Sequence, residues 1–103
     1  MKRNVARIIL ALASTLVVAP AFADLALASS RNCMSCHNLD RKIVGPSLKD
    51  IATKYKGDKT APARLASKIM EGGGGAWGVV KMPANPQVSE AEAKKLAAWV
   101  LSL

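Results

Sequence analysis

One five-residue pattern restricts what this chain can fold around: Cys33-Met34-Ser35-Cys36-His37. Cysteines with this spacing lie about one helical turn apart, so both sulfurs can reach the same edge of a flat partner. The pattern C-x-x-C-H is the one by which c-type haem is attached to a polypeptide. The sulfurs then bond to the two vinyl groups of the haem, and His37 ligates the iron through a ring nitrogen. The motif predicts covalent haem attachment and leaves the second axial ligand open.

Other uses of the cysteine pair compete with this interpretation. A thioredoxin-like pair needs a βαβ setting, but the chain has no run of β-branched strands and is too short for that fold. Structural zinc takes four Cys or His ligands, whereas the chain has 2 cysteines and 1 histidine. A disulfide across so short a loop would stabilise little. A haem-free dithiol oxidoreductase stays an alternative, which predicts a colourless protein with a titratable thiol.

Residues 1–23 have the features of a secretory signal peptide. Three basic residues lie within the first 7 positions, and no charged residue follows until Asp24. The triplet Ala-Phe-Ala before Asp24 fits the small-x-small cleavage pattern. An uncleaved membrane anchor is the alternative, but the uncharged run is shorter than the ~20 residues of a spanning helix and contains Pro20. We therefore predict a cleaved signal peptide over residues 1–23 and a periplasmic location.

Cleavage would leave residues 24–103 as one domain of 80 residues. This segment holds 12 of the 15 Lys and Arg and all 7 Asp and Glu, so its formal charge is +5 rather than +8. A domain of this size buries a modest core, which a large apolar cofactor would extend. The positive charge suggests steering toward acidic partner surfaces, with a merely solvated lysine surface as the alternative. The export signal argues against nucleic acid as a partner.

Apolar residues at helical spacing predict an all-α fold of about four short helices joined by long loops. The first is expected over residues 24–34, with Asp24 as its cap and the cysteine motif at its end. The second is expected over 47–56, ended by Gly57, and the third from 60 or 61 to 70, with Pro62 in its first turn. The glycines 72–75 that follow predict a plain loop.

The last helix has the clearest signals. Ser89 and Glu92 form the capping-box pattern at its start. An apolar stripe follows at helical spacing, formed by Leu96, Trp99, Val100 and Leu103. We expect Trp99 to pack in the core.

The loop over residues 77–86 is long for a small domain, and such loops are usually functional or disordered. Met82 lies on this loop, 45 residues after His37, and Pro83 and Pro86 stiffen its surroundings. A thioether opposite an imidazole is the His/Met ligand set that raises the reduction potential of haem. The spacing favours Met82 as the second axial ligand, and a methionine that only packs is the alternative.

Together these motifs resemble a bacterial class I c-type cytochrome of the short cytochrome c-551/c8 type. The resemblance covers essentially all of residues 24–103. Besides the cysteine motif, it is carried by Val44-Gly45-Pro46, Trp77-Gly78, Met82-Pro83-Ala84-Asn85 and a last helix ending Ala98-Trp99-Val100-Leu101-Ser102.

The resemblance implies the small class I cytochrome c fold, wrapped around one covalently bound haem c. It implies thioether bonds from the haem to Cys33 and Cys36. It also implies that His37 and Met82 are the axial iron ligands.

The same resemblance implies roles for the residues around these ligands. The backbone carbonyl of Pro46 would accept a hydrogen bond from the far nitrogen of His37 and so orient the ring. The Trp77 indole N–H would reach a haem propionate, with help from Lys68. The Asn85 side chain would steady the sulfur of the ligand methionine.

With both axial positions filled, the iron cannot readily bind oxygen or peroxide, and one-electron transfer remains. No Ser/His/Asp set or carboxylate pair supports bond chemistry. We therefore expect a monomeric electron-transfer protein rather than an enzyme, with a quinol-oxidising complex as donor and a terminal reductase or oxidase as acceptor. Ile43 and Val44, close to the motif, are candidates for the partner contact. A five-coordinate haem protein that binds small ligands or has peroxidase activity is the rival class.

Overall fold

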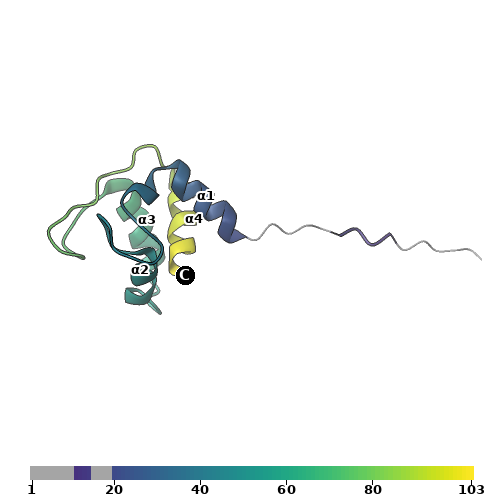
Figure 1. Ribbon diagram of the computed structural model, residues 1–103, viewed down its shortest axis with the longest axis horizontal. Helices are drawn as coiled ribbons and strands as arrows, with labels where there is room; N and C mark the ends of the chain where they lie inside the picture. Colours follow the sequence, from purple (N-terminus) through teal and green to yellow (C-terminus); the bar gives the residue numbers. More distant parts are fainter. Residues whose placement is uncertain (1–10, 15–19) are drawn as a thin grey trace, which may run out of the picture.

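The computed structural model describes residues 11–14 and 20–103, and its ordered elements are helices (Figure 1). They are α1 (Pro20–Ser30), the 3₁₀ helix η1 (Cys33–Ser35), α2 (Leu48–Lys54), α3 (Ala61–Glu71) and α4 (Glu90–Leu101). In this described part of the chain β-pairing is limited to two isolated bridges, so the all-α prediction is confirmed. None of the helices described here has the length and apolar character that a membrane crossing requires.

Most of the predicted signal peptide lies outside the described residues. α1 begins at Pro20 and therefore crosses the predicted cleavage point before Asp24. Cleavage there stays a prediction.

α4 is the central helix, since α1, α2 and α3 all pack against it. Its start is fixed by the predicted capping box: Ser89 Oγ accepts from the Glu92 N–H at 3.2 Å, and Glu92 Oε1 accepts from the Ser89 N–H at 3.1 Å. Trp99 is 6% exposed and lies in the core, as predicted. The rest of the buried cluster comes from every α-helix and from the segment before α4, and includes Ala28, Leu48, Ala66, Val88, Leu96 and Val100.

The second and third helices also agree with the sequence signals. Ser47 Oγ accepts from the Asp50 N–H at 3.0 Å and caps α2. α2 ends two residues before the predicted limit, because the Lys56 N–H bonds to Thr53 O and tightens the chain into a turn. The following Gly57 has φ +78°, and α3 begins as expected with a proline in its first turn.

The prediction for the first helix was wrong at both ends. Asp24 is not a cap but lies inside α1, where the residue is 7% exposed and its Oδ1 is 3.5 Å from Lys95 Nζ on α4. The helix ends at Ser30 because Asn32 adopts a left-handed conformation, φ 65°, which turns the chain out of the helical path. The cysteine motif therefore starts in a separate 3₁₀ turn.

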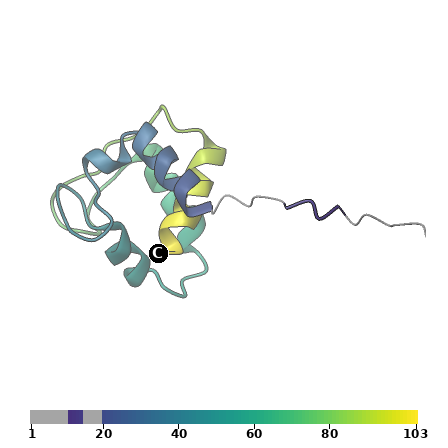
Figure 2. The same ribbon diagram turned by 45° about the vertical axis from the view of Figure 1, so that its right-hand side comes forward.

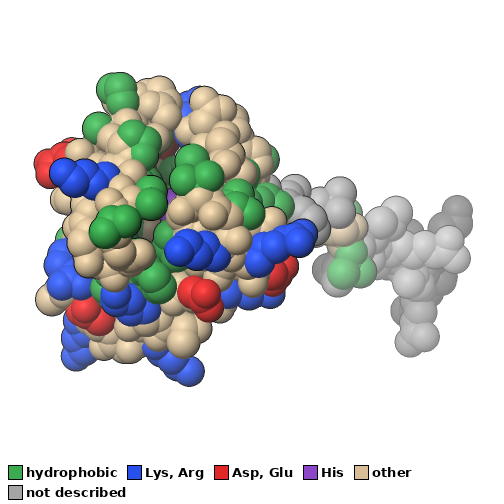
Figure 3. Space-filling model, turned by 60° about the vertical axis from the view of Figure 1, so that its left-hand side comes forward, with side chains coloured by type: hydrophobic (Ala, Val, Ile, Leu, Met, Phe, Trp, Pro, Cys, Tyr) green, Lys and Arg blue, Asp and Glu red, His purple; other side chains and the backbone are tan. Residues whose placement is uncertain are grey.

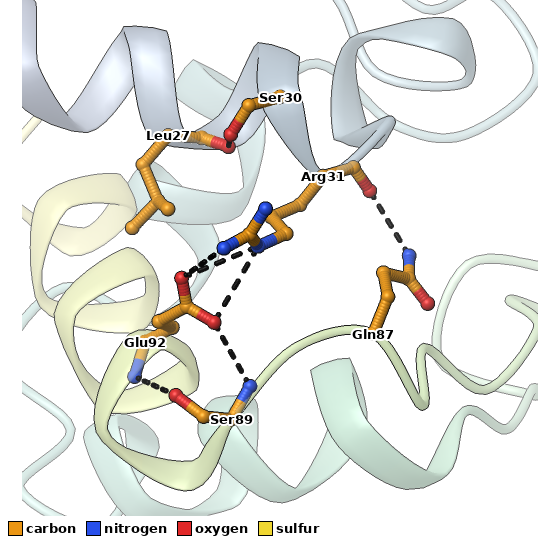
Figure 4. Close-up of polar contacts among 6 residues, drawn as sticks. All are labelled: Leu27, Ser30, Arg31, Gln87, Ser89 and Glu92. Atoms are coloured by element: carbon orange, nitrogen blue, oxygen red, sulfur yellow. Dashed lines mark hydrogen bonds and ion pairs between the residues drawn. The ribbon is translucent and has the colours of Figure 1, made fainter.

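An ionic contact holds the end of α1 against the start of α4 (Figure 4). Arg31 Nη2 donates to Glu92 Oε2 at 2.7 Å, and Gln87 Nε2 donates to the Arg31 carbonyl at 3.1 Å. The hydrogen bond from Arg31 holds the pKa of Glu92 below its usual value. This contact fixes the chain two residues before Cys33.

Candidate cofactor site

A cavity of about 540 Å³ lies beside α4, and its walls are mostly hydrophobic. Figure 2 shows the helices and the long loops that contribute to its walls following one another around a ring. The space-filling view shows a hollow on one face, rimmed by hydrophobic side chains (Figure 3). The lining includes two thiols, an imidazole and a thioether, which belong to Cys33, Cys36, His37 and Met82.

The cysteine motif reaches this cavity through η1. The Cys36 and His37 N–H groups both donate to Cys33 O, at 3.3 and 3.0 Å, which folds the motif into a compact turn. Burial raises the pKa of the Cys33 thiol. Dithiol oxidoreductases rely on a cysteine whose pKa is lowered, so this environment is unfavourable for the haem-free redox alternative.

The imidazole of His37 is held in place by a hydrogen bond at its Nδ1. Its Nδ1 lies 2.8 Å from the carbonyl oxygen of Pro46, the contact that the resemblance implies. A carbonyl can only accept, so Nδ1 carries the proton in this hydrogen bond and Nε2 keeps its lone pair for a metal. A Cβ at Gly45 would lie 2.8 Å from His37 Cε1, so glycine is needed where the loop passes the ring.

Met82 is held by backbone contacts with the glycine segment. Its N–H donates to Gly73 O at 2.8 Å, and its carbonyl accepts from the Gly73 N–H at 2.9 Å. A Cβ at Gly72 would lie 2.6 Å from the Met82 carbonyl oxygen, so the two segments approach closely. The expectation of a plain loop for these glycines was therefore incomplete, because the backbones of Gly72 and Gly73 contact the backbone of Met82 and hold it in place.

Asn85 has other partners than the one expected. Its Nδ2 donates to Ile69 O at 2.8 Å and to Pro83 O at 3.3 Å. A contact with the Met82 sulfur is not among its hydrogen bonds to the described residues. Instead, the amide ties the methionine loop to the end of α3.

Trp77 and Lys68 both line the cavity. Trp77 is 39% exposed, and Lys68 is half-buried beside Gly73. The Nζ of Lys54 lies 4.5 Å from the Trp77 ring centroid and donates to Ala76 O at 2.8 Å. Lys54 is not among the residues predicted from the sequence, because nothing local relates a residue at the end of α2 to a loop more than 20 positions later.

The residues around the cavity fit a haem. Two cysteines can form thioethers, an imidazole nitrogen and a thioether sulfur can coordinate iron, and apolar walls suit a large flat ring. The fold and the site together define a class, that of small all-α proteins with covalently attached haem.

Comparison with known proteins supports this assignment to a class of haem proteins. The Cytochrome c family model matches residues 25–103. The chain is 48% identical over 91 residues to cytochrome c-551 of Allochromatium vinosum, covering 87% of this chain and 97% of that protein. It is 51% identical over 92 residues to cytochrome c-552 of Nitrosomonas europaea, covering 88% and 89%. The crystal structure of wild-type Nitrosomonas europaea cytochrome c552 superposes with a TM-score of 0.75 at 49% identity, covering 77% of this chain and 98% of that chain.

The chain therefore belongs to the cytochrome c family, as a small class I member. It carries one covalently bound haem c and is an electron carrier.

Proposed function

We propose that this protein is a periplasmic one-electron carrier that shuttles electrons from a quinol-oxidising complex to a terminal reductase or oxidase, and is not itself an enzyme. One observation carries the proposal: Cys33, Cys36, His37 and Met82 line a single apolar cavity. That cavity offers two points of covalent attachment and two axial ligands of different chemistry.

In this proposal Cys33 and Cys36 hold the haem, which supplies an Fe(II)/Fe(III) couple. His37 would hold the iron through the Nε2 lone pair, while its Nδ1–H donates to the Pro46 carbonyl. This hydrogen bond fixes the ring and increases its basicity. Met82 would supply a thioether from the loop over residues 77–86, and with both ligands in place one-electron transfer would be the chemistry left to the site.

The surrounding residues have supporting roles. We assign the Trp77 indole N–H and the Lys68 ammonium to the haem propionates, since both line the cavity and both are donors. We assign Asn85 to holding the methionine loop through Ile69 O, at 2.8 Å.

Partner docking is assigned to the loops beside the cavity. Their exposed apolar side chains include Ile43, Val44 and Val80, which are 46%, 54% and 61% exposed, and Val44 and Val80 belong to the lining. Lys42 and Lys81 also belong to this lining. An apolar centre with basic neighbours suits a partner with an acidic rim around a hydrophobic contact. A Val44→Glu variant should transfer electrons to its acceptor more slowly, and an unchanged rate would remove this surface from the proposal.

The axial assignment is tested by the visible and near-infrared spectrum of the oxidised mature protein. We expect the weak charge-transfer band of methionine sulfur bound to Fe(III), and we expect Met82→Ala to abolish it. A spectrum unchanged by Met82→Ala would leave this methionine off the iron and favour the rival five-coordinate haem protein. Mass spectrometry of the exported protein tests the signal peptide, because cleavage before Asp24 leaves an 80-residue chain plus haem.

A further inference from the structure

The loop over residues 74–81 covers part of the cavity with few attachments of its own. All its residues are exposed, and all of them contribute to the cavity lining. Gly75 and Gly78 have positive φ values and open space where a Cβ would stand. At its base the loop is closed by the backbone pair between Gly73 and Met82.

Lys54 supplies the attachment farther along this loop. Its Nζ donates to Ala76 O at 2.8 Å, and this is the only hydrogen bond that the structure describes for residues 74–81. The same ammonium lies 4.5 Å from the centroid of the Trp77 ring, within the range of a cation–π interaction. One charged group therefore holds two consecutive residues of the loop.

Lys54 itself is held by a helix that is packed in the core. Lys54 is the last residue of α2, and α2 is anchored in the core by Leu48 and Ala52. The adjacent Tyr55 ring has Lys54 Nζ at 5.8 Å and the Arg64 guanidinium of α3 at 5.6 Å from its centroid. The loop is thus tied to the end of α2, next to the tyrosine ring that Arg64 of α3 approaches.

We propose that Lys54 is a positioning residue that fastens the glycine-rich loop and Trp77 over one edge of the haem cavity, and thereby raises the reduction potential of the bound haem. The proposal rests on the electron-carrier function. A loop held down excludes water from the haem edge. Because water stabilises the more highly charged Fe(III) state, a drier site favours reduction.

The test compares three variants of the holoprotein. Lys54→Met keeps the aliphatic stem and removes the ammonium, Lys54→Arg keeps a cation that can donate and lie over the ring, and Lys56→Met is the charge-matched control. Lys56 is exposed and does not belong to the cavity lining. Two quantities are measured, namely the rate of thermolysin cleavage within residues 74–81 and the reduction potential.

We expect Lys54→Met to increase loop cleavage about fivefold, the population change that loss of an exposed cation–π contact produces. Its potential should fall further than that of Lys56→Met, and Lys54→Arg should stay close to wild type in both measurements. Unchanged cleavage in Lys54→Met would overturn the proposal, even with a lower potential, because the lysine would then act through its charge alone. Faster cleavage with an unchanged potential would overturn the redox role. Loop cleavage does not depend on electron transfer, so failure of the electron-carrier function would be recognised separately.

Discussion

Replacing Gly72 by alanine should lower the free energy of unfolding and disturb the backbone contacts that hold Met82. Gly72 has φ 72° and ψ −167°, a region that is essentially restricted to glycine, and strain there costs about 1–3 kcal/mol. The added Cβ would also lie 2.6 Å from Met82 O and 2.7 Å from the Ala84 nitrogen. These are backbone atoms that cannot rotate away, and overpacking of this kind costs about 1–3 kcal/mol. Together the two effects predict a loss of about 2–6 kcal/mol in the free energy of unfolding.

Gly57→Ala is the matched control. Gly57 also has a positive φ, +78°, but nothing lies within 4 Å of its Cβ position. The substitution therefore introduces backbone strain without a close approach, and about 1–2 kcal/mol is expected. The difference between the two variants therefore reports the close approach of the glycine segment to the methionine loop together with the extra backbone strain of the Gly72 conformation.

Denaturant unfolding of both holoproteins gives the free energies, and the charge-transfer band of the oxidised protein reports the methionine. We expect Gly72→Ala to lose more stability than Gly57→Ala and to weaken the band, because the Met82 carbonyl must move. A Gly72→Ala protein that is no less stable than Gly57→Ala and keeps a full band would refute the reasoning.

Three further substitutions test the packing and the polar contacts. Leu96→Ala, at a core position that is 2% exposed, should cost about 2–5 kcal/mol in denaturant unfolding. Ser89→Ala removes half of the capping box and should cost about 1 kcal/mol by the same measurement. Arg31 holds the pKa of Glu92 below its usual value, so the stability from this carboxylate is present above about pH 4.3 and is lost as pH falls through the lowered pKa. Melting temperatures measured from about pH 6 to pH 3 should therefore fall less steeply in Glu92→Gln than in wild type, and parallel curves would contradict this.

The sequence predicts best where the deciding contacts are local. The Ser89 to Glu92 capping box lies within one turn of the helix that it starts, and the start of α4 was predicted correctly for that reason. Leu103, predicted on the apolar stripe of this helix, instead lies beyond its end and is 40% exposed. The Cys33 to His37 motif is equally local, and so is the turn at Gly57. In these cases the residues that interact are also near neighbours in the chain.

The first helix shows what a local pattern cannot supply. Asp24 is a good capping residue, but inside α1 its carboxylate forms an ion pair with Lys95, which lies on the last helix. Asn32 did carry a usable signal, because asparagine tolerates the left-handed conformation that ends helices. The contacts of the loop that carries Met82 could not be predicted for a similar reason. The glycine segment and Lys54 contact this loop only in the folded protein, and such contacts leave no periodic pattern in the sequence.

One set of residues forms part of the hydrophobic core and also part of the cavity wall. Leu48, Leu96, Trp99 and Val100 are members of the buried cluster and also line the cavity. The buried residues that do not line the cavity are mostly alanines, namely Ala52, Ala61, Ala66 and Ala93, so the protein interior is small without the haem surface. A chain that has not received its haem should therefore unfold readily and be degraded by proteases, whereas a completed chain should persist. The shared wall therefore predicts that the stability of the fold depends on attachment of the haem.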